Sequence, residues 1–307
     1  MTAAGERRAE DRRWRRWHRW HRWRQSAPVP PALPVAASAF LLAIKAAGAW
    51  ATGSLALGSA ALDSLIDCFV YGASFVARRR GAAPPDSDHA FGHGKYEDLA
   101  MLGQGLFLVG AAGALVTAGV ERLISHAAPR QTTLGMAVLG ASLLVGLLVT
   151  PRLERDARRS GSPALKADSR HFRTDLWING SALLALAVVR WTGWAAIDPV
   201  TALLVAAYVF RNASGLVLEA LGGLSDRALA PADLRRIEAV VGSFRPAVAG
   251  MHGLQTRSSG GRIFISLHLE IPRRTSFVAA HELIVRVLRA VEKELPRSQV
   301  FVHGDPV

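Results

Sequence analysis

The stretch Ala61–Val70, "ALDSLIDCFV", places two aspartates four residues apart inside one of the most apolar parts of the chain. In a helix, residues four apart lie on one face about one turn from each other, so Asp63 and Asp67 can converge on one object. A charge at the centre of a bilayer costs about 2.5 to 3.5 kcal/mol. If this segment crosses a membrane, the two carboxylates therefore need a cation, protons or a polar partner.

The surrounding composition favours a membrane protein. The 307 residues are 50% hydrophobic with a mean hydropathy of +0.20, yet they carry a net charge of +13. Apolar segments of membrane-spanning length, about 20 residues, predict six transmembrane helices at 32–52, 55–77, 98–123, 133–149, 164–189 and 196–221. We therefore divide the chain into a basic cytoplasmic tail (1–30), a six-helix transmembrane domain (31–225) and a cytoplasmic domain (226–307).

Positive charge in short loops sets the orientation. Lys and Arg gather in the N-terminal tail, in "ARRRG" (Ala77–Gly81) and in "PRLERDARRSG" (Pro151–Gly161), whereas the alternate connections hold few. This pattern predicts a multi-pass protein of the cell (inner) membrane with both termini cytoplasmic and no cleavable signal peptide. The single cysteine, Cys68, excludes an intramolecular disulfide and a Cys-based zinc finger.

After Ser225 the pattern becomes that of a soluble domain. Periodicity predicts a helix at 231–241, strands at 247–257 and 262–271, a helix at 276–295 and a strand at 299–303. The segment "RIFISLHLEI" (Arg262–Ile271) alternates as a half-buried strand should. In "VHGDP" (Val302–Pro306), His303 and Asp305 occupy alternating positions of a strand and therefore point to one side.

A second pair of polar residues appears in "ADSRHFRTDLWING" (Ala167–Gly180), where His171 and Asp175 are again four apart. Together with Asp63 and Asp67 they make a four-ligand set of oxygen and nitrogen donors, which suits tetrahedral Zn²⁺ and other borderline divalent ions. The alternative is that these are isolated polar residues satisfied by backbone or water. The loop "PPDSDHAFGHGKYEDLA" (Pro84–Ala100) adds Asp86, His89 and His93, which are either metal ligands or ordinary solvated residues.

Three motifs carry a family resemblance. They are "ATGSLALGSAALDSLIDCF" (Ala51–Phe69), "DSDHAFGHGKYEDL" (Asp86–Leu99) and "SPALKADSRHFRTDLWINGSALLAL" (Ser162–Leu186), in this order and spacing. The chain resembles the cation diffusion facilitators, in particular the bacterial zinc and ferrous-iron efflux members, over nearly everything after the first 30 residues.

The resemblance implies a fold of six transmembrane helices followed by a metallochaperone-like αββαβ domain, assembled as a homodimer. It implies a transport site made by Asp63, Asp67, His171 and Asp175, and a weaker loop site made by Asp86, His89 and His93. It also implies a binuclear cytoplasmic site at the dimer interface, with Asp305 as the bridging carboxylate, made by His252, His268, His281, His303 and Asp305. A salt bridge near that interface is implied between Lys95 and Asp226.

The implied function is proton-coupled export of divalent metal, Zn²⁺ first, with Cd²⁺ and Fe²⁺ close behind, by a secondary transporter and not an enzyme. Metal binding needs neutral His171 and ionised aspartates, so it releases protons, and protons can compete at the same site. Divalent metal would be both substrate and regulatory ion. The alternative is a membrane metal sensor or store without net transport. A metallohydrolase is disfavoured because four protein ligands leave no open position.

The tail "RRWRRWHRWHRWRQ" (Arg12–Gln25) has no counterpart in the resemblance. Its tryptophans recur every three residues among arginines, which suits an anionic leaflet. The alternatives are a disordered tail that enforces orientation, or metal capture by His18 and His21. Nucleic-acid binding is not expected on a membrane protein.

Overall fold

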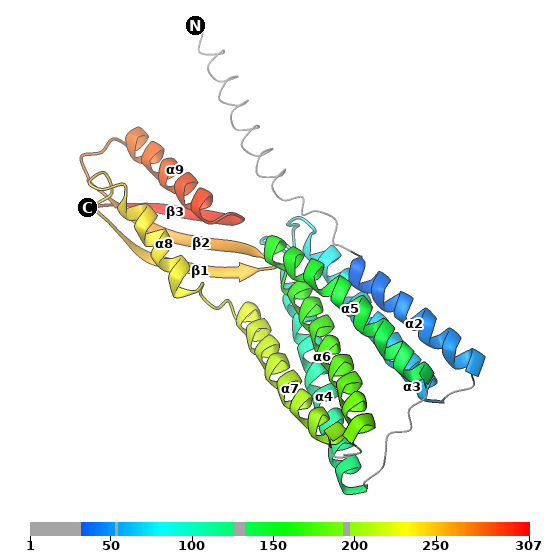
Figure 1. Cartoon of the computed structure of the whole chain (residues 1–307). Coiled ribbons are helices and arrows are strands. Elements are labelled where there is room, and N and C mark those ends of the chain that lie inside the picture. The colour runs from blue at the N-terminus through cyan, green and yellow to red at the C-terminus, as the bar shows by residue number, and fades with distance from the viewer. Residues whose placement is uncertain (1–31, 53–54, 126–132, 193–196) are drawn as a thin grey trace.

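The computed structural model describes residues 32–52, 55–125, 133–192 and 197–307 of the chain (Figure 1). In this part of the chain six long helices form a bundle, and a smaller domain of helices and a three-stranded sheet follows beyond one end of it. The tail 1–30 lies outside the described residues, so its roles stay predictions.

The bundle confirms the expected helical membrane domain. Its helices are α2 (Leu33–Thr52), α3 (Leu55–Gly81), α4 (Lys95–Ser125), α5 (Thr133–Ser160), α6 (Pro163–Thr192) and α7 (Ile197–Leu224). Within the described residues, five of them are long and apolar enough to cross a membrane by length and composition, and α6 is not. The N-terminal half of α6 is too polar for that criterion, because it carries a run of charged residues that includes two predicted ligands.

Three close helix pairs organise the bundle. α4 packs most extensively against α7, α2 against α3, and α5 against α6. At the end near the sheet, Arg78 of α3 and Asp168 of α6 are both buried and form an ion pair, and Arg78 also donates a hydrogen bond to Ser74. Burying two charges is tolerable when they pair and hydrogen-bond. This pair therefore ties the two helices that carry the predicted transport ligands.

The segment after Val149 differs from the sequence-based expectation. We expected a loop at Pro151–Gly161, but α5 continues through Pro151 to Ser160. Leu153 and Ala157 are buried, one turn apart on one face, and pack in the same cluster as Phe172. This apolar stripe offsets the hydrogen bond that a proline removes from a helix interior. The basic residues of this segment therefore project from a rigid helix.

The soluble domain has the expected αββαβ order: α8 (Pro231–Gly242), β1 (Gly250–Ser259), β2 (Arg262–Ile271), α9 (Phe277–Glu294) and β3 (Ser298–Pro306). The sheet order is β1-β2-β3, with β1 antiparallel and β3 parallel to β2. Alternate residues of β2, including Leu267 and Leu269, are fully buried in the core with Val287 and Val291 of α9. The opposite residues of β2 are left on the other face of the sheet.

The turn between β1 and β2 touches the bundle directly. Gly260 and Gly261 have φ angles of +56° and +76°, and a side chain at Gly260 would meet the Cα atom of Gly94 at 2.6 Å. Only glycine combines this backbone conformation with so close an approach. The contact places the sheet beside the loop that precedes α4.

Candidate metal centres

The membrane site brings α3 and α6 together. His171 Nε2 lies 3.5 Å from Asp67 Oδ1 and 3.8 Å from Asp175 Oδ1. A tetrahedral ion with ligand bonds of about 2.1 Å holds its ligand atoms about 3.4 Å apart. Each of these two separations fits such an ion, but the ligand atoms of Asp67, His171 and Asp175 do not all lie within 4.8 Å of one another. The donors are one imidazole and two carboxylates.

The fourth predicted ligand stands slightly apart. Asp63 lies one helical turn before Asp67 on α3, and its residue is exposed. Among the described residues no ion pair joins Asp63 to His171 or Asp175, although its charge acts on Asp67. The structure thus places His171 next to both Asp67 and Asp175, and leaves Asp63 one turn away on α3.

Two polar residues beside this site were missed from the sequence. The amide of Gln104 on α4 lies 3.3 Å from His171 Nδ1, the nitrogen turned away from the carboxylates. Lys45 on α2 donates a 2.8 Å hydrogen bond to Ser64, and its charge acts on both Asp67 and Asp175. Neither could be assigned to the site from local spacing, because each comes from a different helix.

The three loop residues lie close together, as the loop site implied by the resemblance requires. Asp86 Oδ1 lies 3.3 Å from His89 Nδ1, and Asp86 Oδ2 lies 3.2 Å from His93 Nε2. One ligand atom from each of the three lies within 4.8 Å of the others. The backbone N–H of His89 donates to Asp86, and this hydrogen bond is the main cause that holds the pKa of Asp86 below its usual value. A carboxylate that stays ionised in this way is a ready cation ligand.

The loop is held against the sheet by aromatic contacts. Phe91 lies edge-on to Phe264 of β2, with ring centroids 5.7 Å apart. The guanidinium of Arg257 stacks over both rings, at 4.5 Å and 5.0 Å from their centroids. A cation above an aromatic face is attracted to the negative face of the ring, so Arg257 holds the two rings together. The loop site is therefore coupled mechanically to the soluble domain.

On the sheet, the strand register creates a row of histidines. His252 pairs with His268 across β1 and β2, and His268 pairs with His303 across β2 and β3. Neighbouring rings are 5.1 Å and 5.0 Å apart. A bulge lies between His252 and Gln255 and contains Gly253, whose φ is +60°. These side chains occupy the face of the sheet opposite the hydrophobic core.

Asp305 lies at the centre of this row. Its carboxylate is 2.8 Å from His268 Nδ1 and 3.2 Å from both His252 Nε2 and His303 Nε2. The hydrogen bond with His268 is the main cause that lowers the pKa of Asp305, and the other two histidines lower it further. Atoms of His252, His268 and Asp305 lie within 4.8 Å of one another, a spacing that fits a divalent ion.

Two differences from the predicted cytoplasmic set follow from the geometry. Among the described residues, no hydrogen bond or ion pair links His281, which is exposed on α9, to the histidine row. Glu270, which we did not predict, lies 3.2 Å from His252 Nδ1. Glu270 follows His268 by two residues in a strand, so the alternation of β2 places both on one face and could have identified it.

The predicted pair of Lys95 and Asp226 forms within one chain. Lys95 Nζ lies 2.7 Å from Asp226 Oδ1 and also contacts the carbonyl oxygen of Gly223. Arg257 Nη1 lies 3.2 Å from both oxygens of the same carboxylate. The junction thus joins the start of α4, the segment that follows α7 and strand β1.

Comparison with known proteins gives the family context. Residues 33–225 match the cation efflux transmembrane domain, and residues 229–307 match the cation efflux protein, cytoplasmic domain. The chain is 36% identical over 271 residues to the cation-efflux pump FieF of Escherichia fergusonii, covering 88% of this chain and 90% of the relative. It is 35% identical over 271 residues to FieF of Shigella flexneri, with the same coverage. A solved structure, the metal-bound C-terminal domain of the CzcD transporter from Thermotoga maritima, is 28% identical with a TM-score of 0.24, covering 25% of this chain and 94% of that one.

Proposed function

Because this chain belongs to the cation efflux family, the cation diffusion facilitators, we propose that it exports Zn²⁺ from the cytoplasm in exchange for protons. Cd²⁺ and Fe²⁺ are the next candidates. The observation that carries the proposal is the position of His171, whose Nε2 lies 3.5 Å from Asp67 and 3.8 Å from Asp175 inside the helical bundle. Imidazole with carboxylates is a donor set that borderline divalent metals favour.

Proton exchange follows from the same donors. A metal ion binds neutral His171 and ionised aspartates, so protons and metal compete for the same atoms. When the site faces the cytoplasm, near-neutral pH favours metal. When it faces a more acidic exterior, protonation of His171 and one aspartate releases the metal outward, as alternating access requires. Asp63, one turn from Asp67, would complete the site in the loaded state.

The two other clusters have supporting roles in this proposal. The loop residues Asp86, His89 and His93 lie close to one another and against the sheet, which suits a weak site near the cytoplasmic face. The histidine row around Asp305 would hold cytoplasmic metal at the interface of a homodimer. The protein would lie in the inner membrane with both termini in the cytoplasm. Metal held there favours one dimer arrangement over another and so regulates transport.

The test of transport uses proteoliposomes that contain the full chain and an imposed pH gradient. Zn²⁺ uptake and proton counterflow are followed together for three proteins: the unchanged chain, Asp175→Asn on α6, and Glu121→Gln on α4. The last is a control that removes an exposed carboxylate of another helix. We expect Asp175→Asn to abolish both fluxes and Glu121→Gln to keep them.

The same assay separates the alternative of a metal sensor or store. Zn²⁺ binding to the unchanged chain without any net uptake would support that alternative. Zn²⁺ uptake that is indifferent to the pH gradient would contradict proton exchange, and normal uptake by Asp175→Asn would contradict the site.

A further inference from the structure

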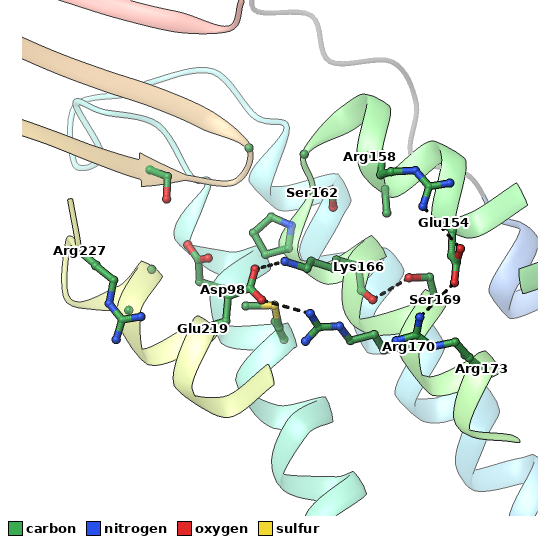
Figure 2. A pocket seen from close by; sticks show the side chains of 18 of the residues that line it. Asp98, Glu154, Arg158, Ser162, Lys166, Ser169, Arg170, Arg173, Glu219 and Arg227 are labelled. Carbon is green, nitrogen blue, oxygen red and sulfur yellow. Dashed lines mark hydrogen bonds and ion pairs between the residues drawn. The ribbon is translucent and has the colours of Figure 1, made fainter. Parts of the chain in front are cut away.

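A polar cavity of about 550 Å³ lies at the end of the bundle next to the sheet. It is an open cavity lined by α4, α5, α6 and α7, and it reaches the turn between β1 and β2 (Figure 2). Its lining holds five cationic side chains, those of Arg158, Lys166, Arg170, Arg173 and Arg227. Three carboxylates face them, those of Asp98, Glu154 and Glu219. The cavity therefore carries an excess of positive charge.

Two of the carboxylates are each shared between two cations. Glu219 of α7 forms an ion pair with Lys166 and lies 3.6 Å from Arg170, both on α6. Figure 2 shows these pairs as dashed lines that meet at one carboxylate. One carboxylate offers about four acceptor positions but a single negative charge. Glu219 therefore neutralises only one of the two positive charges that Lys166 and Arg170 carry.

The second shared carboxylate is Glu154 of α5. It lies 3.5 Å from Arg158 on its own helix and 3.5 Å from Arg173 on α6. Both separations exceed the range of a charge-assisted hydrogen bond, about 2.7 to 2.9 Å. These guanidinium groups therefore keep donors that a better acceptor can take.

One further donor faces the same cavity. Arg227 lies against Gly222, and among the described residues it forms no ion pair. The N-terminus of α6 already has a carboxylate beside it, because Ser162 accepts from the backbone N–H of Leu165 and donates to Glu97. A divalent metal would be repelled by this lining, so the cavity is distinct from the metal centres.

We propose that this cavity binds a phosphate group, presented either by the headgroup of an acidic phospholipid or by free phosphate. Phosphate offers several acceptor oxygens, and arginine forks bind them in pairs. Figure 2 shows Arg227 on one side of the cavity and Arg158 and Arg173 on the other. One phosphate group would therefore take donors from Arg170 of α6 and Arg227 after α7, while Arg158 and Arg173 add positive charge to the lining. Its binding would hold α6 against α7.

The experiment measures the thermal unfolding midpoint of the full chain in nanodiscs. One arm adds phosphatidylglycerol to phosphatidylcholine discs in phosphate-free buffer, and the other adds inorganic phosphate to pure phosphatidylcholine discs. The pocket variant is Arg170→Gln with Arg173→Gln. The control is Arg152→Gln with Arg155→Gln, which removes the same charge from exposed positions of α5 that do not line the cavity.

We expect the midpoint of the unchanged chain and of the control to rise with one of the two probes and to saturate. The pocket variant should need at least about tenfold more of that probe for the same rise, because each guanidinium–phosphate contact is charge-assisted. The arm that responds identifies the source of the phosphate. No rise in either arm, or the same loss in both double variants, would overturn the proposal.

A second variant guards against a pocket variant that does not fold. Arg227→Gln removes a donor that holds no carboxylate, so it should leave the fold intact while weakening the response to the same probe. If Arg170→Gln with Arg173→Gln does not fold, and the unfolding midpoint of Arg227→Gln still rises with the probe as in the unchanged chain, this would also count against the site. None of these outcomes depends on whether the chain transports metal.

Discussion

Replacing Gln104 with leucine tests how the bundle prepares His171 for a metal. Gln104 is buried, its amide nitrogen lies 3.3 Å from His171 Nδ1, and its oxygen has no hydrogen-bond partner within the described part of the chain. A half-turn of the amide group makes the oxygen accept from Nδ1–H, and it costs little because the two ends are similar in size. That arrangement leaves the Nε2 lone pair facing Asp67 and Asp175, where a metal would sit.

The magnitude follows from what the leucine removes. It leaves Nδ1–H buried without an acceptor, which costs about 1 to 3 kcal/mol. Loss of a partner that orients a metal-binding histidine lowers affinity by about 10- to 100-fold, which corresponds to about 1.4 to 2.7 kcal/mol. The two figures agree, so we expect the half-saturating Zn²⁺ concentration of Gln104→Leu to rise by about 10- to 100-fold.

The assay is Zn²⁺ uptake into proteoliposomes, because the loop and sheet residues can bind metal but would not carry it across. Ser142→Ala serves as a control, since Ser142 is another buried polar side chain of the bundle whose hydroxyl has no hydrogen-bond partner among the residues that the structure describes. A half-saturating concentration within twofold of the unchanged chain in Gln104→Leu would refute the reasoning. An equal rise in Ser142→Ala would refute it as well, because the effect would then be general loosening of the bundle.

The remaining predictions concern the soluble side. Hydrogen bonding from Lys95, and then Arg257, lowers the pKa of Asp226, so the stability that this carboxylate contributes is present above about pH 4 and is lost as the pH falls through the lower folded value. Asparagine tolerates the φ of 55° at this position, so Asp226→Asn should lower the folding stability by about 1 kcal/mol at pH 7, measured by thermal unfolding. It should also reduce the loss of stability below about pH 4, and an unchanged dependence of stability on pH would contradict this. Asp305→Asn should abolish the rise in unfolding midpoint that Zn²⁺ gives the full chain, whereas Glu282→Gln on α9 should keep it, and an undiminished rise in Asp305→Asn would rule out its bridging role.

The fold was predictable where the pattern is local. The alternation in Arg262–Ile271 gives β2 with unchanged bounds, because one face of that strand is buried and the other is not. The end of α5 was not predictable in this way. A proline next to charged residues ordinarily marks a helix boundary, and only the packing of Leu153 shows why the helix continues. Tertiary contacts outweighed the local signal there.

The same distinction applies to the metal centres. Pairs four apart on one helix, such as His171 and Asp175, are visible in the sequence because helix geometry fixes their neighbourhood. Gln104 and Lys45 were not visible, because their approach depends on which helices pack together. His281 was included by resemblance alone, and the described residues of one chain do not bring it to Asp305.

The cationic cavity shows a third kind of case. In the sequence, the basic residues of Pro151–Gly161 predict the orientation of the protein in the membrane. That prediction uses only how many basic residues there are and on which side of the membrane they lie. In the structure Arg158 of this segment lines one cavity together with Lys166, Arg170 and Arg173 of α6, and Glu154 and Glu219 must each serve two cations there. Sharing of this kind is a property of the packed helices and leaves no trace in spacing or composition. Charges that a sequence reading assigns to topology can therefore also form a binding site, and the test is whether they share too few counter-charges.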